Sequence, residues 1–415
     1  MAISLRKLHA TEPARILRDL LADASVTRAL NFFETHHAAI TAQHEAICRI
    51  PAPPFGEAER ARLLLKLFQA RGLADAEIDS EGNVTALRRG RDLHPLLVVS
   101  AHLDTVFPAG TDFNVHTDAH GNLRAPGIAD DGAGLAALVA LAEALQVENI
   151  ETAGSLLFVA TVGEEGAGNL RGVRHLLTAG KWAGEVDAFI SLDGPGVERI
   201  THRALGSRRW RVHVRGAGGH SWGDFGTPSP VHALARAVAR LSSYDAPARP
   251  RTTFNVGRIE GGTAVNVIAA EACMEVDLRS ESGDELARLD TFFRRGIEEA
   301  VAAANDTRRA GTTPLALDMQ LIGDRPSGET PADTTLVHLA QEATRHLGFR
   351  PRLDCSSTDS NIPVSLGIPA ITLGAGGASG NSHTLDEWYD PRGRHIGLKR
   401  NLLVALGMAG VISDE

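Results

Sequence analysis

The chain has 415 residues, of which 43% are hydrophobic and 22% are charged. This length is too great for one compact core and predicts two domains, or one domain with a large insertion. The formal net charge of −9 gives no overall positive field, so we expect neither nucleic acid nor an anionic membrane as a partner.

The cysteines and the N-terminal segment indicate in which cellular compartment the protein is expected. Cys48, Cys273 and Cys355 lie far apart and form no paired motif, so disulfides are not expected. The N-terminal segment lacks the basic and then apolar pattern of a signal peptide, and no apolar run is long enough to span a bilayer. These features predict a soluble protein in a reducing compartment, and the cytoplasm is the expected location.

The first part of the chain predicts helices and then an alternation of strands and helices. Residues 1 to about 50 have apolar residues at helical spacing, and a second helix is expected at 57–69. His44-Glu45 resembles the start of a zinc-protease helix motif, but Cys48 stands where the second histidine belongs, so no metal site is predicted there. Strands are expected at 84–87, 96–101, 156–162 and 188–192, with a helix at 134–145. This order is typical of a mixed, mostly parallel sheet with helices on both faces.

The pattern changes near Gly206. Apolar and polar residues alternate over 210–214, which predicts an antiparallel strand with one face in solvent. Ser229 as N-cap and Pro230 at the first helical position predict the start of a helix. Later elements are expected as strands at 253–256, 272–278 and 315–322 and as a helix from 284 to about 303. The resulting order β-α-β-β-α-β predicts a ferredoxin-like α+β domain.

The α/β pattern resumes after this segment. A helix is expected at 334–347 and a buried strand at 368–373, followed by a glycine-rich loop that leads to His383. The predicted larger domain therefore consists of residues 1–205 and 325–415, and residues 206–324 form the inserted domain.

Histidines and carboxylates follow the predicted buried strands at their carboxyl ends. His102 follows the strand at 96–101, and the nearby carboxylate of Asp104 is expected to accept a hydrogen bond from one ring nitrogen while the other binds a metal. The other such sites are Glu164-Glu165, Asp193 and His383, with Asp130-Asp131 in the turn before the helix at 134–145. Open α/β sheets place their chemistry at this edge. The sequence therefore predicts a metal site there.

The ligand types narrow the choice of metal. Two imidazoles and at least three carboxylates, without a thiolate, suit Zn, Mn or Co, and one carboxylate can bridge two ions about 3.5–4 Å apart. The adjacent anions Glu164 and Glu165 repel each other unless one binds a cation and the other faces its bound water. The alternative, a set of solvated acidic turns, does not explain why these residues share one position on several strands.

Five motifs in this order resemble those of the M20 family of co-catalytic zinc peptidases, which includes the tripeptide aminopeptidase and related amidohydrolases. The motifs are His102-Leu-Asp104, Gly127-Ile-Ala-Asp130-Asp131, Gly163-Glu164-Glu165-Gly166, Ser191-Leu-Asp193 and Ser382-His383. The resemblance covers nearly the whole chain and implies two divalent metal ions per chain, with Zn expected and Mn or Co as alternatives. It implies a bridging Asp130, with His102 and Asp193 completing one site and Glu165 and His383 the other.

The same resemblance implies the catalytic roles. Asp104 is the partner that orients His102. Glu164 is the general base, which takes a proton from the attacking water and passes it to the leaving amine. The family often has a lysine where this chain has Gly132, a position that is not a ligand.

The inserted domain resembles the family's lid, which also forms the dimer interface, so a homodimer is expected. His220 matches a lid histidine that reaches a neighbouring subunit's active site and polarises the substrate carbonyl. Asn266 and Arg279 match lid residues that hold a substrate carboxylate or oxyanion in some members. The alternatives for these two residues are a turn asparagine and a strand arginine paired with Asp277 or Glu275.

The resemblance also bears on the substrate. The ligand at Asp193 is aspartate more often in members that cleave peptides with a free amine, and glutamate more often in deacylases. This favours an aminopeptidase or dipeptidase that acts on di- and tripeptides. An amidohydrolase or carboxypeptidase-like enzyme for N-acyl or N-carbamoyl amino acids is the alternative. A metal-free dimeric binding protein is the third hypothesis, but it predicts lost ligands and none is lost.

A serine hydrolase is a further rival. Residues 219–223 fit the Gly-x-Ser-x-Gly elbow, with Ser221 as the nucleophile. That elbow needs a helix directly after the serine, and the residues up to Ser229, with Pro228 among them, intervene here. We therefore expect Ser221 not to act as a nucleophile.

Overall fold

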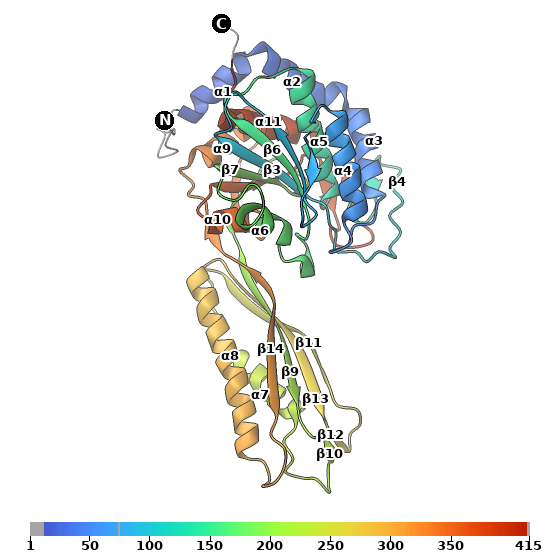
Figure 1. Ribbon diagram of the computed structural model, residues 1–415, viewed down its shortest axis with the longest axis vertical. Coiled ribbons are helices and arrows are strands. Elements are labelled where there is room, and N and C mark those ends of the chain that lie inside the picture. The colour runs from blue at the N-terminus through green and yellow to red at the C-terminus, as the bar shows by residue number, and fades with distance from the viewer. Residues whose placement is uncertain (1–11, 74, 413–415) are drawn as a thin grey trace. The chain divides into compact units, whose positions relative to one another are not determined.

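The computed structural model describes residues 12–73 and 75–412. The described chain divides into two compact units, one formed by the residues up to Ala204 and from Glu329 onward, the other by Leu205–Gly328. Each unit has its own sheet (Figure 1). Each unit also has its own hydrophobic core. Residues 1–11 of the predicted N-terminal helical region lie outside the described residues.

A mixed sheet forms the centre of the first unit. Its strands are β1 (Glu77–Ile78), β2 (Val84–Arg88), β3 (Leu96–His102), β6 (Ser155–Thr161), β7 (Ala188–Leu192), β8 (Arg199–Ala204), β15 (Gly328–Glu329), β16 (Arg352–Ser356) and β17 (Ala370–Leu373). Within the described residues the sheet has nine strands in the order β1-β2-β6-β3-β7-β17-β8-β15, with β16 beside β8. The central strands β6, β3, β7 and β17 run parallel, whereas β2 and β8 run antiparallel to their neighbours β6 and β17. The predicted mixed, mostly parallel sheet is confirmed.

The central strands are buried because apolar and small side chains occupy both of their faces. β3 reads LLVVSAH and β6 reads SLLFVAT, and every residue of both strands is buried. Such runs are expected in parallel strands that helices cover on both sides. Because these strands run parallel, their carboxyl ends lie at the same edge of the sheet.

Helices cover both faces of this sheet (Figure 1). They are α1 (Glu12–Ala22), α2 (Ala24–Thr35), α3 (His37–Cys48), α4 (Ala58–Ala70), α5 (Gly132–Val147), α6 (Arg171–Thr178), α9 (Thr335–His346), α10 (Asn361–Ser365) and α11 (Arg394–Ala409). α6 and α10 cover one face, and α5, α9 and α11 pack on the other. α5 is apolar or small around almost its whole circumference, as expected of a helix enclosed between a sheet and other helices.

A second, smaller sheet lies in the same unit. Its short strands are β4 (His116–Thr117), β5 (Leu123–Arg124), β18 (Ala378–Gly380) and β19 (Trp388–Asp390), in the order β18-β19-β5-β4. β5 precedes the turn that contains Asp130, and β18 and β19 flank the loop that contains His383. This sheet therefore connects two segments that are far apart in the sequence.

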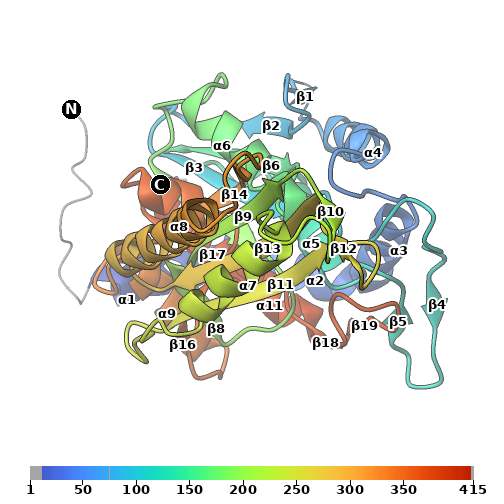
Figure 2. The same ribbon diagram turned by 90° about the horizontal axis from the view of Figure 1, so that it is seen from below.

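The second unit is a ferredoxin-like α+β sandwich, as predicted. Its elements are β9 (Gly206–Arg215), β10 (Gly219–His220), α7 (Pro230–Leu241), β11 (Thr252–Gly261), β12 (Val267–Ile268), β13 (Glu271–Ser280), α8 (Gly283–Asp306) and β14 (Ala316–Arg325). The antiparallel sheet β11-β13-β9-β14 has α7 and α8 side by side on one face (Figure 2). Met274, Val276 and Leu278 of β13 are buried in the core with these helices, while the residues between them are only partly buried.

Among the described residues, none of the helices combines the length and the apolarity that crossing a bilayer requires.

Candidate metal centre

The carboxyl edge of the large sheet is fixed by main-chain hydrogen bonds that continue past the strands. The N–H of Leu103, just after β3, donates to the carbonyl of Thr161 at the end of β6, at 2.7 Å. The N–H of Asp193, just after β7, donates to the carbonyl of Leu373 at the end of β17, at 3.0 Å. The residues that follow these strands are therefore held in register with one another.

The predicted ligands converge at this edge. Among the described residues, three groups place potential ligand atoms within 4.8 Å of one another. The groups are His102 with Asp130 and Asp193, Asp130 with Glu165 and His383, and His102 with Glu164 and Glu165. The first two groups are triads that share Asp130, and a shared carboxylate between two sets of ligands is the arrangement that a two-metal site requires.

The two carboxylate oxygens of Asp130 face different histidines. Its Oδ1 lies 3.0 Å from Nε2 of His102, and its Oδ2 lies 3.0 Å from Nε2 of His383. The same Nε2 of His383 lies 2.9 Å from Oε1 of Glu165. Asp130 therefore belongs to both triads, and each of its oxygens faces the histidine of one of them.

Asp104 contacts both sides of the cluster. Nδ1 of His102 donates to the main-chain carbonyl of Asp104 at 2.9 Å, whereas the carboxylate oxygen Oδ1 is 3.6 Å away. The sequence predicted the carboxylate as the acceptor, so this detail is corrected. The carboxylate instead accepts the N–H groups of Glu164 at 2.9 Å and Glu165 at 2.8 Å. A proton on Nδ1 leaves the lone pair of the neutral ring on Nε2, the nitrogen that faces Asp130.

The cluster perturbs the acidity of its members. Burial lowers the pKa of His102, but contacts with Asp104, Asp130 and Asp131 outweigh burial and raise it well above its ordinary value. Hydrogen bonds to Asp130 and Glu165 raise the pKa of His383 to about 10. Without a metal, the contacts with these carboxylates therefore favour the positively charged form of both imidazoles.

The pKa of Asp193 is also raised, but for a carboxyl group this favours the neutral form. Burial raises the pKa of Asp193 to about 7, and the nearby Asp130 adds to this rise. A cation at this position would stabilise the ionised form and displace the proton.

Two further buried carboxylates hold the main chain around the cluster. The sequence placed Asp131 in the cluster without a role of its own, whereas Glu387 was missed. Asp131 is the N-cap of α5, where it accepts the N–H of Gly134 at 3.0 Å and the N–H of His102 at 3.1 Å. Glu387 accepts N–H groups of the turn that contains Asp130. The sequence marks Asp131 only through its place beside Asp130, and it gives no signal for Glu387, whose burial depends on contacts with distant segments.

Gly132 has no room for a side chain. A Cβ atom there would lie 2.2 Å from Sγ of Cys48 and 3.1 Å from Nε2 of His44. The lysine that is frequent at this position in the family is therefore incompatible with the packing of α3 against this turn.

The three predicted lid residues belong to the second unit, and the structure brings only two of them together. β10 pairs with β12, and the N–H of Ser221 donates to the carbonyl of Asn266 at 3.0 Å, so His220 and Asn266 are neighbours. Arg279 lies near the other end of β13, opposite Ser207, and its Nε donates to Asp277 at 2.6 Å. The ion pair considered as an alternative for Arg279 is thus present.

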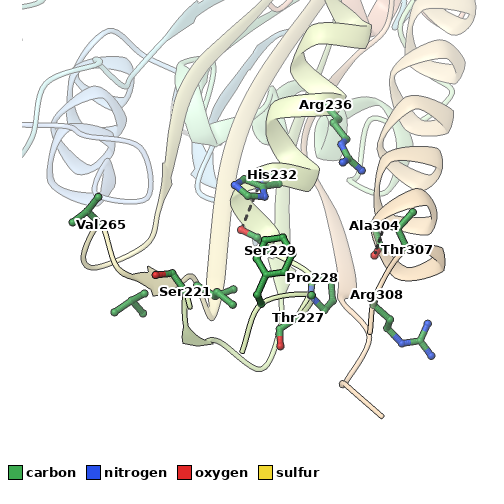
Figure 3. A pocket seen from close by; sticks show the side chains of 14 residues that line it. Ser221, Thr227, Pro228, Ser229, His232, Arg236, Val265, Ala304, Thr307 and Arg308 are labelled. Atoms are coloured by element: carbon green, nitrogen blue, oxygen red, sulfur yellow. Dashed lines mark hydrogen bonds between the residues drawn. The ribbon is translucent and has the colours of Figure 1, made fainter. Parts of the chain in front are cut away.

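A pocket of about 390 Å³ lies in the second unit (Figure 3). Its lining includes Ser221 and the basic residues His232, Arg236 and Arg308, but none of the predicted metal ligands. α7 begins only at Pro230, and within the described chain no hydrogen bond joins the Ser221 hydroxyl to a histidine. The geometry of a serine nucleophile is therefore missing from this segment, as the sequence predicted.

The fold and the cluster define a metallohydrolase of the α/β class with an inserted lid. The profile of Peptidase family M20/M25/M40 matches residues 98–403. The chain belongs to this family of metallopeptidases and amidohydrolases, and the predicted family resemblance is confirmed.

Sequence and structure comparisons find a desuccinylase and two solved peptidase structures that are similar to this chain. Succinyl-diaminopimelate desuccinylase of Leptothrix cholodnii is 29% identical over 339 residues, which cover 76% of this chain and 82% of the relative. The structure of aminopeptidase PepT from Bacillus cereus has a TM-score of 0.72 at 20% identity and covers 90% of this chain and 99% of its own. The YXEP protein of Bacillus subtilis, described as a dinuclear metal binding peptidase, has a TM-score of 0.65 at 18% identity and covers 91% and 100%. At these identities the two structures support the fold alone.

Proposed function

We propose that the protein is an aminopeptidase or dipeptidase that cleaves di- and tripeptides with the help of two divalent metal ions. The observation that carries the two-metal centre of this proposal is the pair of ligand triads that share Asp130. The preference for peptides with a free amine rests on the aspartate at position 193. His102 and Asp193 complete one proposed site, and Glu165 and His383 complete the other.

The donor set fits two divalent cations. It consists of imidazole nitrogens and carboxylate oxygens without a thiolate, which suits Zn²⁺, with Mn²⁺ or Co²⁺ as alternatives. The two oxygens of Asp130 already face separate histidines at 3.0 Å each. Several carboxylates in one buried cluster repel one another, and bound cations would remove that repulsion.

Bound cations would polarise the scissile carbonyl and lower the pKa of the attacking water. In this proposal Glu164 takes the proton of that water and passes it to the leaving amine. Two features of Glu164 support this role: it is only 5% exposed, and it lies in one group with His102 and Glu165. Asp104 holds the N–H groups of both glutamates and thereby positions Glu164.

The second unit is proposed as the lid and as the interface of a homodimer. His220 is proposed to polarise the substrate carbonyl in the neighbouring subunit. Its Nδ1 accepts the N–H groups of Trp222 at 3.2 Å and Gly223 at 3.3 Å, so the neutral ring carries its proton on Nε2 and can donate it to a carbonyl oxygen. Asn266 and Arg279 are proposed to bind a substrate carboxylate or oxyanion. The side chain of Arg279 is 38% exposed and donates to Asp277 through Nε.

The proposed compartment is the cytoplasm. Cys48, Cys273 and Cys355 are all free thiols in the structure, which is the state expected in a reducing environment.

An amidohydrolase or carboxypeptidase-like activity on N-acyl or N-carbamoyl amino acids is the second candidate. It is favoured by the similarity to a desuccinylase, whose name denotes an N-acyl substrate. Both candidates use the same metal centre and differ in the group that flanks the scissile amide.

A substrate panel separates the two candidates. The full chain is assayed on dipeptides, tripeptides, N-acyl amino acids and N-carbamoyl amino acids with added Zn²⁺, Mn²⁺ or Co²⁺. The proposal expects cleavage of peptides that have a free amine. Turnover of N-acyl amino acids with di- and tripeptides untouched would replace it with the second candidate.

A further inference from the structure

The turn that carries Asp130 is held by one carboxylate from a distant part of the chain. Oε1 of Glu387 accepts the N–H groups of Ala129 at 2.8 Å and Asp130 at 3.0 Å, and Oε2 accepts the N–H of Gly127 at 3.1 Å. Glu387 is fully buried. A buried carboxylate is costly unless hydrogen bonds compensate it. These three N–H groups offset part of that cost, although burial still raises the pKa of Glu387 to about 7.

The opposite side of the same turn is held by a histidine of α3. Nε2 of His44 donates to the carbonyl of Ile128 at 2.6 Å, and Nδ1 accepts from Nη2 of Arg394 at 2.7 Å. Burial and the charge of Arg394 hold the pKa of His44 well below its ordinary value, so the ring is neutral and has one donor and one acceptor. The peptide groups of residues 127–130 therefore bind side chains that come from two other regions of the sequence.

Glu387 also belongs to the short loop that carries His383. It lies four residues after His383, and its own N–H donates to the carbonyl of Thr384 at 3.2 Å. β19, which begins at the next residue, pairs with β5, which precedes the Asp130 turn. The carboxylate of Glu387 thus joins the main chain of Asp130 directly to the loop of His383.

Packing alone does not explain the position of His383. Its side chain is 51% exposed, and its φ of 65° is in the left-handed region, which costs energy for a residue other than glycine. Such a conformation persists only when the surrounding structure holds it. The bonds of Glu387 are placed to hold it, because they fix the loop against the Asp130 turn.

We infer that Glu387 is a positioning residue of the metal centre, which sets the distance between Asp130 and His383 and so the affinity of the site that these residues form with Glu165. Its role parallels that of Asp104, which joins His102 to Glu164 and Glu165 on the other side of the cluster. Partners of this kind affect metal affinity although they do not touch the ion. The inference rests on the proposed metal centre.

The test compares two carboxylates that each accept three main-chain N–H groups, in different turns. In the Glu387→Gln variant, an amide nitrogen replaces one acceptor oxygen, so at least one N–H of the Asp130 turn loses its partner. The matched control is Asp79→Asn. Oδ1 of Asp79 accepts the N–H groups of Glu81, Gly82 and Asn83, each at 2.9 Å, in a turn without predicted ligands.

The measurement is the binding of Zn²⁺ alone to the full chain after removal of metal by a chelator, followed by competition with a chromophoric chelator. The wild type is expected to bind two ions. Glu387→Gln is expected to weaken one of them by about 10- to 100-fold, because partners outside the ligand shell typically have effects of this size. Asp79→Asn is expected to leave both affinities within about twofold, which is less than the effects of such partners.

Thermal melting of the metal-free variants separates positioning from stability. A merely structural role of Glu387 predicts a lower Tm with unchanged Zn²⁺ affinities, and this result would overturn the inference while leaving the proposed function intact. Absence of Zn²⁺ binding by the wild type would overturn both. If Glu387→Gln does not fold, Glu387→Asp decides, since its shorter side chain keeps the charge but cannot reach all three N–H groups. Weaker binding at one site supports the inference, and two unchanged sites refute it.

Discussion

The sheet of the inserted unit pairs its acidic side chains with arginines, whereas the carboxyl edge of the sheet in the larger unit gathers several acidic side chains with two histidines. On the open face of the lid sheet, Arg209 lies 3.2 Å from Asp277, and Arg211 lies 2.8 Å from Glu275. At the carboxyl edge of the large sheet, by contrast, Asp130 and Glu165 contact histidines. Paired charges near solvent need no other partner. A buried cluster of carboxylates is costly without positive charge close by, which supports the proposal that metal ions bind there.

The largest expected effect comes from the carboxylate that both triads share. Asp130→Ala removes a ligand from both proposed metal sites, so both ions should bind far more weakly and amide hydrolysis should fall to background. Metal analysis of the purified variant and an assay of peptide cleavage measure these effects. Asp277→Ala, which removes a carboxylate of the lid sheet, is the matched control and should keep two ions per chain. If Asp130→Ala retained two ions, Asp130 would not be a ligand of the two metal sites, and the proposed difference between the two units would be wrong.

Replacement of the proposed base should separate chemistry from metal binding. Glu164→Ala is expected to lower turnover by about 10²- to 10⁴-fold, the usual contribution of a general base, with both ions retained. Turnover and metal content are measured on the same preparation. Unchanged turnover would remove Glu164 from its proposed role, and loss of an ion would assign it to the ligands.

The pH dependence of metal binding tests whether His102 and His383 are metal ligands. In the metal-free cluster, hydrogen bonds to Asp130 and Glu165 raise the pKa of His383 to about 10, and contacts with carboxylates also raise the pKa of His102, so a bound proton is favoured on both rings. A metal ion must displace these protons, so its affinity should rise with pH below pH 10, by about tenfold per pH unit for each proton released. Calorimetric titration at pH 6, 7 and 8 in buffers of different ionisation enthalpy counts the protons. An affinity that does not change with pH would show that the histidines are not ligands.

The smallest effect is expected in the lid sheet. Removal of the partly exposed carboxylate of Asp277 breaks its ion pairs with Arg209 and Arg279. Each such pair contributes about 0–1 kcal/mol, so Asp277→Ala should lower the free energy of unfolding by no more than about 2 kcal/mol. Denaturant unfolding measures the change. A loss of several kcal/mol would mean that the paired charges of the lid contribute more to folding than solvent-exposed pairs do.

Much of the fold could be predicted because its signals are local. The strand predicted at 188–192 is observed as β7 (Ala188–Leu192), and the Ser229-Pro230 cap begins α7 as predicted. β11 was predicted only at 253–256 but extends over Thr252–Gly261. It is an edge strand with many exposed residues, so its far half has no apolar pattern to reveal it.

The candidate site also has one part that the sequence could predict and another that it could not. His102 and Asp193 could be predicted because buried parallel strands bring their carboxyl ends to one edge. The roles of Glu387 and His44 could not, because Glu387 bonds to Gly127 across 260 positions and His44 bonds to Ile128 across 84. Such contacts exist only once the chain has folded, and neither residue lies in a motif that specifies them.

The most direct test of the central claim is a crystal structure of the Zn²⁺-loaded protein with anomalous diffraction data at the zinc edge. The account predicts two anomalous peaks on either side of the Asp130 carboxylate, one beside His102 and Asp193 and the other beside Glu165 and His383. A single peak that Asp130 does not contact, or peaks only at other places in the molecule, would contradict it.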